Sequence, residues 1–373
     1  MSSPVVISLP RSKSIVIRCL IVHYVKTGAL LPVFENDPND IKIVYNALKT
    51  IDLQKKNRVG ERCVIDVEDC GAAYRFLMPL LAATSGNWLL TGTPRLLERP
   101  ILPLVNFLNT HGANIEKISS GWKIQGRVFQ IKEIDIDAGE SSQFVSAVMM
   151  LQAESRMHEC NILNSQNPYI RMTERILQIA ANRDAIYGVS TFSDWSAAAF
   201  WIANAALAPN AHYLLNDLHF DKLQGDASIA ILAAQWGIHI SENKLGIEVR
   251  QIHKLEVSKQ SIDVSNTPDL AMILATLAVC YPFELTLSGV QTLNFKESNR
   301  LDIMVAELSK FTTIEKHSEN AITIYKRNTA LPTEFHFNSY NDHRFVMAWM
   351  LFKNYGNVHI NNYDCVRKSY PDF

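Results

Sequence analysis

The sequence predicts an α/β protein of two domains in which helices pack against mixed or antiparallel sheets. Three stretches contain an apolar segment of helical period, a turn and two short alternating segments typical of a hairpin, and they begin at Ile101, Ala227 and Arg300. The length of 373 residues exceeds what one hydrophobic core usually holds. The sequence has neither a Gly-rich dinucleotide motif nor a Walker loop, so we do not expect a doubly wound parallel sheet.

The elements follow one another as variations of this helix-plus-hairpin unit. Leu9–Val25 opens with turn and cap residues and continues as a long apolar run, which is typical of a helix entering a core. Weaker copies of the unit begin near Asp40 (DIKIVYNALKTI) and Thr173 (TERILQIAANRDAIYG). The clear copies are ILPLVNFLNTHGANIEKISSGWKIQG, ASIAILAAQWGIHISENKLGIEVR and RLDIMVAELSKFTTIEKHSENAITIYK. Intervals of roughly 50 to 75 residues are too long for a solenoid repeat. The polar stretch 186–194 is the best candidate for a domain boundary.

The composition limits the partners of the protein. Lys and Arg number 36 and Asp and Glu number 37, so no overall field would hold nucleic acid or an anionic membrane, and any anion must be bound locally. The sequence shows no secretory leader and no apolar run long enough to span a bilayer, and its 6 cysteines include no Cys-x-x-Cys pair. We therefore expect a cytoplasmic protein with reduced thiols that binds neither nucleic acid nor membrane.

Two helix starts carry residues suited to an anion. Ser14 and Arg18 share one helical face next to Lys13, at the end of a helix where backbone N–H groups also point outward. Ser141 and Ser142 begin a second apolar helix in the same way. The alternative is that Lys13 and Arg18 extend to water and that the serines only cap their helices.

A series of short motifs runs through nearly the whole chain. The motifs are SKSIVIR (12–18), the loop Gly71–Arg75, ERPI (98–101), SSQF (141–144), PY (168–169), SDWSAA (193–198), LQGD (223–226), PDLAM (268–272), KESNR (296–300), YNDHR (340–344) and KSYPDF (368–373). In this order they resemble the motifs of the 5-enolpyruvylshikimate-3-phosphate synthase family. KESNR together with NDHR is the most specific pair.

The resemblance implies the two-domain fold of the enolpyruvyl transferases, with three helix-plus-sheet (βαβαββ-like) units in each domain. Residues 12–192 would form an inserted domain, and residues 1–11 and 193–373 would form the second domain, with the active-site cleft between them. The resemblance also implies a monomer.

The implied reaction transfers the enolpyruvyl group of phosphoenolpyruvate to the 5-hydroxyl of shikimate 3-phosphate, in the shikimate pathway of aromatic amino acid biosynthesis. It proceeds by addition and elimination through a tetrahedral intermediate and releases phosphate. Because two phosphates and two carboxylates must be desolvated together, a set of Lys and Arg side chains is needed to offset the cost. The chemistry requires no metal and no cofactor.

The resemblance assigns residues to each substrate. Shikimate 3-phosphate would be bound by Ser14, Arg18, Ser141, Ser142, Tyr169, Asp269 and Lys296. Phosphoenolpyruvate would be bound by Lys13, Gly71, Arg99, Gln143, Arg300, His343, Arg344 and Lys368.

The catalytic roles are hypotheses that follow from the same resemblance. Asp269 would accept the hydroxyl proton, and Glu297 with Lys13 would move the proton at C3. Negative charge on the departing phosphate would be stabilised by Lys368, Arg344 and Arg99. Apart from the resemblance, Asp269 would be a helix cap after Pro268, and Glu297 would be a surface partner of Arg300 three residues away.

Several positions depart from the family pattern. Asp69 and Ala72 stand in a loop that usually contains Asn-x-Gly-Thr, and Glu140 directly precedes the serine pair. A carboxylate that faces the site would weaken anion binding, so we expect an active enzyme with altered affinity for phosphoenolpyruvate.

Two competing hypotheses remain open from the sequence. One is the related transferase that acts on UDP-N-acetylglucosamine, which normally carries a reactive cysteine in a basic loop, whereas Cys70 is not in such a loop. The other is a noncatalytic relative that binds an anionic metabolite or serves as an interaction scaffold.

Overall fold

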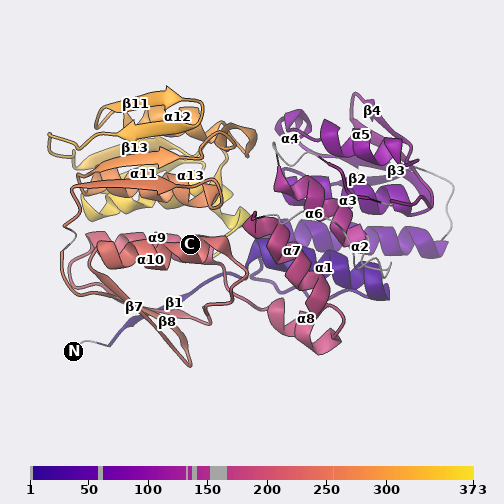
Figure 1. Ribbon diagram of the computed structural model, residues 1–373, viewed down its shortest axis with the longest axis horizontal. Helices are drawn as coiled ribbons and strands as arrows, with labels where there is room; N and C mark the ends of the chain where they lie inside the picture. The colour runs from indigo at the N-terminus through magenta and orange to yellow at the C-terminus, as the bar shows by residue number, and fades with distance from the viewer. Residues whose placement is uncertain (1–2, 58–61, 132, 137–140, 152–165, 255) are drawn as a thin grey trace. The chain divides into compact units, whose positions relative to one another are not determined.

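The chain folds into two compact units, shown in Figure 1. The computed structural model describes residues 3–57, 62–131, 133–136, 141–151, 166–254 and 256–373. The inserted unit contains Ser12–Thr191, and the outer unit joins Met1–Arg11 to Phe192–Phe373. Phe192 thus belongs to the outer unit, one residue away from the division expected from the sequence.

The outer unit contains two four-stranded sheets and one strand pair. The first sheet has the order β1-β6-β8-β7, with β1 (Val5–Ser8), β6 (His212–Asn216), β7 (Ile238–Asn243) and β8 (Gly246–Gln251). The second has the order β9-β10-β12-β11, with β9 (Lys259–Asp263), β10 (Glu284–Ser288), β11 (Ile314–Ser318) and β12 (Ala321–Ile324). The strand pair contains β13 (Glu334–Asn338) and β14 (Asn357–Asn361), which are parallel.

The inserted unit repeats the same sheet topology. Its sheet has the order β2-β3-β5-β4, with β2 (Cys63–Asp66), β3 (Gly86–Thr91), β4 (Ile115–Ile118) and β5 (Gly121–Gly126). In all three four-stranded sheets the first two strands are parallel, and the last two form an antiparallel hairpin whose second strand pairs with the middle of the sheet. A parallel pair needs a crossover, which α3 supplies between β2 and β3 and which includes α11 between β9 and β10, whereas the connection from β1 to β6 contains the whole inserted unit and α9.

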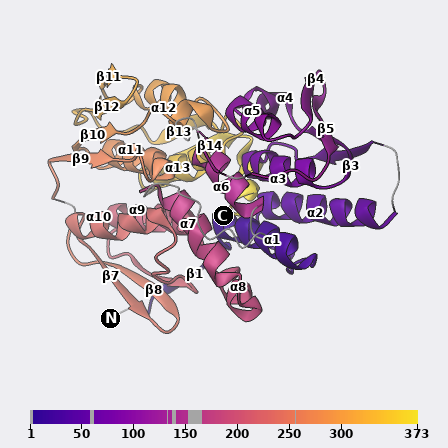
Figure 2. The ribbon, with the colours of Figure 1, turned by 45° about the vertical axis from the view of Figure 1, so that its right-hand side comes forward.

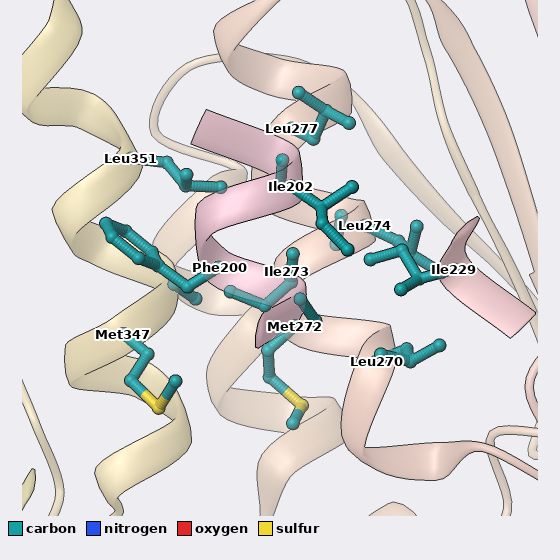
Figure 3. Packing of buried hydrophobic residues seen from close by; sticks show 14 of the residues in the cluster. Phe200, Ile202, Ile229, Leu270, Met272, Ile273, Leu274, Leu277, Met347 and Leu351 are labelled. Carbon is teal, nitrogen blue, oxygen red and sulfur yellow. The ribbon is translucent and has the colours of Figure 1, made fainter. Parts of the chain in front are cut away.

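The helices of the outer unit are largely apolar. They are α9 (Trp195–Leu207), α10 (Ile229–Gln235), α11 (Ala271–Cys280), α12 (Arg300–Leu308) and α13 (His343–Trp349), with 3-10 turns η1 (Gly225–Ser228), η2 (Pro268–Leu270), η3 (Leu293–Phe295), η4 (Met350–Asn354) and η5 (Tyr363–Lys368). Every residue of α11 is buried, and α11 contacts both α9 and α13. Figure 3 shows Ile273 and Met272 packed near Phe200 of α9. A helix that is apolar on all sides belongs inside a protein, and α11 forms the centre of this core.

The inserted unit is built around α1. Its helices are α1 (Lys13–Thr27), α2 (Asn39–Asn57), α3 (Gly71–Ala83), α4 (Pro94–Glu98), α5 (Leu102–Thr110), α6 (Ser142–Leu151), α7 (Pro168–Ile179) and α8 (Arg183–Val189). All residues from Ile15 to Val25 are buried, and α1 contacts α2, α3, α6, α7 and α8. Figure 2 shows α1 and α2 lying side by side. The segment that begins with Pro-Arg-Ser-Lys-Ser is thus a core helix, as expected.

The three clear helix-plus-hairpin predictions are confirmed. They correspond to α5 with β4 and β5, α10 with β7 and β8, and α12 with β11 and β12. The weaker copies were only half right. After α2 comes β2, which pairs in parallel with β3, and Arg183–Val189 forms α8 instead of a strand. Asn182 caps α8 by accepting hydrogen bonds from the N–H groups of Asp184 and Ala185, a local helix signal that outweighs the β pattern.

Two further expectations concern the whole chain. Cys19, Cys63, Cys70, Cys280 and Cys365 are free thiols, and Cys160 lies outside the described residues. Within the described residues, we find no helix with both the length and the apolar character that crossing a bilayer requires.

Candidate functional site

Arg300 organises a buried cluster of charges in the outer unit. Its side chain is 2% exposed. Nε donates to Asp342 at 2.8 Å, Nη1 donates to Asp269 at 2.7 Å, and Nη2 donates to Glu297 at 2.8 Å and to the second oxygen of Asp342 at 3.1 Å. Burial by itself would lower the pKa of Arg300, but the three carboxylates raise it well above its ordinary value. The guanidinium therefore remains charged and joins three segments that are far apart in the sequence.

The loop before α13 holds Asp342 in place. Tyr340 and Asn341 both adopt left-handed backbone angles, with φ of 54° and 57°. Such a conformation is uncommon outside glycine and is often found at functional sites. Asp342 then caps α13 by accepting from the backbone N–H of Arg344 at 3.0 Å, and it accepts from the hydroxyl of Ser298 at 2.9 Å. The cap and the ion pair use the same carboxylate, so the start of α13 and the position of Arg300 are linked.

Asp269 lies between two arginines. One carboxylate oxygen accepts from Arg300, and the other accepts from Nη2 of Arg344 at 2.8 Å. Burial would raise the pKa of Asp269, but the charges of Arg344, Arg300 and Lys296 outweigh it and hold the pKa well below its usual range. In this arrangement Asp269 is a strong ion-pair partner and a weak base.

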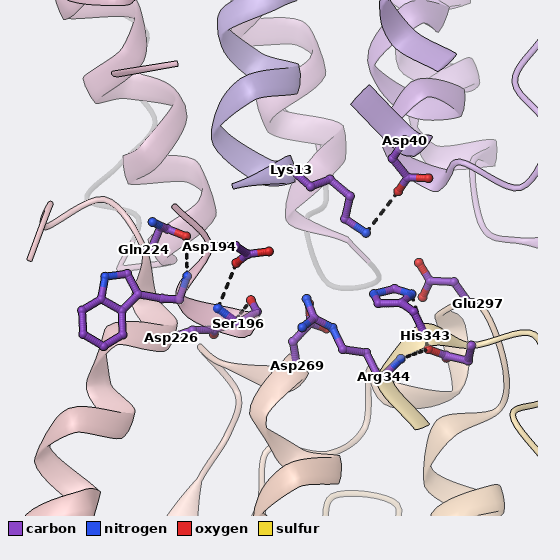
Figure 4. A network of polar contacts seen from close by, with 12 residues as sticks. Lys13, Asp40, Asp194, Ser196, Gln224, Asp226, Asp269, Glu297, His343 and Arg344 are labelled. Carbon is purple, nitrogen blue, oxygen red and sulfur yellow. Dashed lines mark hydrogen bonds and ion pairs between the residues drawn. The ribbon is translucent and has the colours of Figure 1, made fainter. Parts of the chain in front are cut away.

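A second buried carboxyl lies near Asp269. Asp226 accepts a hydrogen bond from the hydroxyl of Ser196. Burial, together with the negative charges of Asp269 and Asp194, raises the pKa of Asp226 to about 7, although Ser196 and Arg344 oppose the rise. Figure 4 shows Asp194 at the start of α9, where it accepts from the N–H of Ser196 at 2.9 Å. Asp226 is therefore a carboxyl that can exchange a proton near neutral pH.

Of the remaining predicted residues of the outer unit, Lys296, Glu297 and His343 lie on the same segments, and Lys368 ends η5. His343 and Lys368 are buried, at 1% and 6% exposure, and His343 Nδ1 lies 3.8 Å from a carboxylate oxygen of Asp342. Lys296 and Glu297 are partly buried, and the charge of Lys296 acts on Asp269. None of these charged side chains is a solvated surface group.

In the inserted unit, the start of α1 carries two of the predicted cations. Nζ of Lys13 pairs with Asp40 of α2 at 3.1 Å, as Figure 4 shows. Arg18 is 2% exposed, and its Nη1 donates to the backbone oxygen of Ser14 at 2.8 Å. Its Nε donates to the hydroxyl of Thr173 at 2.8 Å. Burial lowers the pKa of Arg18 to about 10, so the side chain is still a cation at neutral pH.

Arg18 also connects two helices that carry predicted shikimate-side residues. Thr173 lies on α7, and its hydroxyl donates to the backbone oxygen of Tyr169 at 3.0 Å. The guanidinium of Arg18 lies 5.0 Å from the ring centre of Phe76 on α3. Arg18 thus contacts Ser14 directly and is connected to Tyr169 through Thr173.

Gly71 and Arg99 are in direct contact. A Cβ atom built on Gly71 would lie 2.3 Å from Nη1 and 2.7 Å from Cζ of Arg99, so only glycine leaves room for the guanidinium. Arg75 donates to the backbone oxygen of Gly71 at 3.4 Å and to the side-chain oxygen of Gln143 at 3.0 Å. Three predicted phosphoenolpyruvate-side residues, Gly71, Arg99 and Gln143, therefore cluster around the first turn of α3, and Arg75 connects them.

The other residues of the inserted unit are placed as follows. Ser141 accepts from the N–H of Gln143 at 3.2 Å, which is a capping contact for α6, and Ser142 is the first residue of that helix. Asp69 is partly buried, one residue before Cys70, whose sulfur caps α3 by accepting from Ala73 at 3.4 Å. Glu140 lies outside the described residues. Thus the capping alternative for Ser141 and the anion-binding prediction are compatible with one another.

In these clusters, most of the buried positive side chains lie next to groups that compensate their charge. Arg300 and Arg344 are paired with carboxylates, and Arg18 and Arg75 donate to backbone oxygens, which offsets the cost of burying these charges. The motifs indicated the cations, including Arg75 in the Gly71–Arg75 loop, but they assigned no role to several partners of these cations, which are Asp40, Thr173, Asp226 and Asp342. Asp226 and Asp342 do lie in the LQGD and YNDHR motifs, and this was the only signal available. Among the described residues, the group with metal-ligand geometry is Glu334 with His336 and His359, and it includes none of these residues.

Comparison with known proteins shows consistent similarity over the chain. The family profile described as EPSP synthase (3-phosphoshikimate 1-carboxyvinyltransferase) matches residues 42–373. A 3-phosphoshikimate 1-carboxyvinyltransferase of Bacteroides fragilis is 29% identical, over 98% of this chain and 93% of the relative. One from Aliivibrio salmonicida is 28% identical, over 98% and 94%.

The fold is also similar to that of a solved structure. An EPSP synthase from Acinetobacter baumannii superimposes with a TM-score of 0.67 at 18% identity, covering 99% of this chain and 93% of that one. At this identity the match concerns the fold, and it agrees with the two-domain α/β architecture expected from the sequence.

The raised pKa of Asp226 predicts a pH-dependent effect of Asp226→Asn on stability. The folded-state pKa of about 7 exceeds the unfolded value of about 3.9, so the folded protein holds an extra proton between these values and loses stability as pH rises through them. Asparagine cannot ionise, so the variant should be more stable than the parent at pH 8 by roughly 1–4 kcal/mol, and the gain should shrink toward pH 4. Thermal or urea unfolding at pH 5 and pH 8 measures this.

The control is Asp364→Asn, which removes a carboxylate whose side chain is 89% exposed. It should change stability little at either pH. A stability difference for Asp226→Asn that stays constant between pH 5 and pH 8 would mean that Asp226 is ionised throughout.

Proposed function

Because the chain belongs to the EPSP synthase family, the 3-phosphoshikimate 1-carboxyvinyltransferases, we infer that it transfers the enolpyruvyl group of phosphoenolpyruvate to the 5-hydroxyl of shikimate 3-phosphate and releases phosphate. The observation that carries this inference is the family match over residues 42–373. The buried clusters agree with it, since most of the cations predicted for the two anionic substrates are at least partly buried.

The two substrates correspond to different side-chain groups of the inserted unit. The group around Gly71, with Arg99 and Gln143, is proposed to bind phosphoenolpyruvate. The group around Arg18, with Ser14 and Tyr169, is proposed to bind shikimate 3-phosphate. The support in each case is that one buried contact network joins residues assigned to one substrate.

The outer unit contributes the residues proposed for proton transfer and for charge stabilisation. Asp269 is proposed as the base for the 5-hydroxyl, and its low pKa in the absence of ligand requires an explanation. An anionic substrate that pairs with Arg344 would remove part of the positive charge that stabilises the carboxylate. The pKa of Asp269 would then rise, so substrate binding would itself make Asp269 a better base.

Glu297 and Lys13 are proposed to handle the proton at C3. Glu297 is held by Arg300 at 2.8 Å, and Lys13 is held by Asp40 at 3.1 Å. Each group is thereby held in place by an oppositely charged partner, and general acid–base catalysis requires positioned groups of this kind. Lys368, Arg344 and Arg99 complete the proposal as the cations that stabilise the departing phosphate.

The proposal also includes the oligomeric state and the location of the protein. A monomer in the cytoplasm is implied by the family resemblance. Sedimentation of the purified protein as a single chain of 42.1 kDa would support the monomer, and a stable dimer would contradict it.

The direct test measures phosphate release from phosphoenolpyruvate. The purified full chain should release phosphate when shikimate 3-phosphate is present and should release none without it. NMR of the product should show an enolpyruvyl ether on the 5-hydroxyl. Release that depends on UDP-N-acetylglucosamine instead, or no release with either acceptor, would contradict the proposal.

Asp269→Asn and Glu297→Gln should each lower kcat by roughly 100-fold or more, since a positioned acid or base contributes about 10²–10⁴-fold to the rate. Both variants keep an oxygen that accepts from Arg300, so the buried network can persist. Steady-state kinetics with both substrates, together with thermal unfolding, distinguishes a role in proton transfer from a role in positioning the arginines. Normal kcat with only a raised KM, or with only lowered stability, would show that these carboxylates just position the arginines.

Gly71→Ala should impair the enzyme through Arg99. The added methyl group would overlap the guanidinium at 2.3 Å, so Arg99 must move away. Because both residues are assigned to phosphoenolpyruvate, its KM should rise about tenfold or more, while the KM for shikimate 3-phosphate changes less. Gly188→Ala is the matched control, because nothing lies within 4 Å of that position. Equal effects of Gly71→Ala on both KM values would place Arg99 elsewhere.

A further inference from the structure

Glu334, His336 and His359 lie together on an exposed surface of the outer unit. One ligand atom from each side chain can be chosen so that all three lie within 4.8 Å of one another. The imidazole rings of His336 and His359 are stacked, with ring centres 4.9 Å apart and planes 11° apart. A carboxylate oxygen of Glu334 lies 3.1 Å from Nε2 of His359. These are three side chains with metal-binding atoms in one small volume.

The strand pair β13–β14 produces this arrangement. His336 and His359 are directly opposite each other in the parallel register, and Glu334 precedes His336 by two residues. Residues two apart on a strand face the same side, so all three side chains share one face. The three side chains are therefore placed together by the pairing of two strands and not by the conformation of loops.

The other face of β13 anchors the strand. Phe335 and Phe337 alternate with the exposed residues and are 1% and 4% exposed. Their rings pack against Phe352, at centre distances of 4.8 Å and 5.2 Å. A ligand set built on a strand held in this way is better fixed than one on a loop.

Asn357 supplies a supporting contact next to the group. Its side-chain nitrogen donates to one oxygen of Glu334 at 2.7 Å, while the other oxygen is directed at His359. Second partners that orient a ligating side chain are a regular feature of metal sites.

We propose that Glu334, His336 and His359 form a binding site for a divalent first-row transition metal ion, with Zn²⁺ as the reference ion. Two imidazoles and one carboxylate are a donor set that zinc uses when water fills its fourth position. Mg²⁺ and Ca²⁺ prefer sites made of oxygen atoms, so they should bind poorly. A tetrahedral zinc ion needs nitrogen atoms roughly 3.3 Å apart, whereas the ligand atoms here lie within 4.8 Å of one another. Because the side chains are exposed, they can rotate to bring these atoms closer together.

The site would link two strands that pair only with each other among the residues that the structure describes. β13 and β14 form a two-stranded sheet, and such a sheet is of marginal stability by itself. β13 leads into the loop that ends at Asp342 and then into α13, which carries Arg344, and β14 leads into η5, which ends at Lys368. A bound ion would therefore stabilise the strand pair from which two of the candidate functional segments emerge. This inference concerns metal binding and stands independently of the proposed reaction.

The test is calorimetric titration of the metal-free full chain with ZnCl₂ and with NiCl₂. We expect one equivalent of each ion to bind with a dissociation constant in the micromolar range, whereas MgCl₂ should give no comparable signal. His336→Gln and His359→Gln should each weaken zinc binding at least tenfold. CoCl₂ should give visible absorption bands of a nitrogen-ligated ion in the parent protein, and these bands should be lost in both variants.

His219→Gln is the matched control. His219 is also an exposed histidine paired with a glutamate, Glu242, at 2.9 Å. Among the described residues, however, His219 and Glu242 belong to no group of three possible metal ligands. This variant should bind zinc like the parent. Zinc should also raise the thermal unfolding midpoint of the parent and of His219→Gln, but not that of His359→Gln.

Circular dichroism should show that all three variants are folded, since the substituted side chains are on the surface. No saturable zinc binding below about 100 µM would overturn the proposal, because a three-ligand site should bind more tightly than that. Unchanged zinc affinity in both His336→Gln and His359→Gln would overturn it as well, since the ion would then be bound elsewhere.

Discussion

The burial of the Arg300 guanidinium among three carboxylates is the interaction on which the outer unit most depends. Asp269, Glu297 and Asp342 come from three separate segments, and one planar cation fixes all of them at 2.7–2.8 Å. Removing one partner of a buried ion pair typically costs about 3–5 kcal/mol, because the remaining charge is left uncompensated. The positions of η2, the KESNR segment and the start of α13 are therefore set together.

This charge balance also bears on how an anion can bind. Arg344 shares Asp269 with Arg300, so a phosphate or carboxylate that approaches Arg344 competes with an internal carboxylate. The cations are held in position before any ligand arrives, and less ordering remains to be done on binding. An anion is attracted less strongly as a result, because the positive charges of Arg300 and Arg344 are already compensated by carboxylates. A nearly neutral protein can thus hold many buried cations and still fold.

The repeated sheet topology explains where such residues stand. Each four-stranded sheet has a parallel pair of strands followed by a hairpin, and several candidate residues lie at the starts of helices that follow strands. Gly71 begins α3, Arg300 begins α12 and Arg344 lies in the first turn of α13. At such positions the backbone N–H groups point out of the helix, which favours anions. The same local geometry therefore recurs in both units with different side chains.

The sequence by itself determined which segments form helices with hairpins and which cations belong to the candidate site. Apolar periodicity predicted α5, α10 and α12 with their hairpins, and the motif order indicated the family and the arginines. Only the tertiary structure decided which carboxylate pairs with which cation, because Asp342 and Arg300 or Asp40 and Lys13 are neighbours in space and not in the chain. It likewise decided that β13 pairs with β14. Local propensity acts over a few residues, whereas pairing and the resulting pKa values depend on burial and on charges brought in from distant segments.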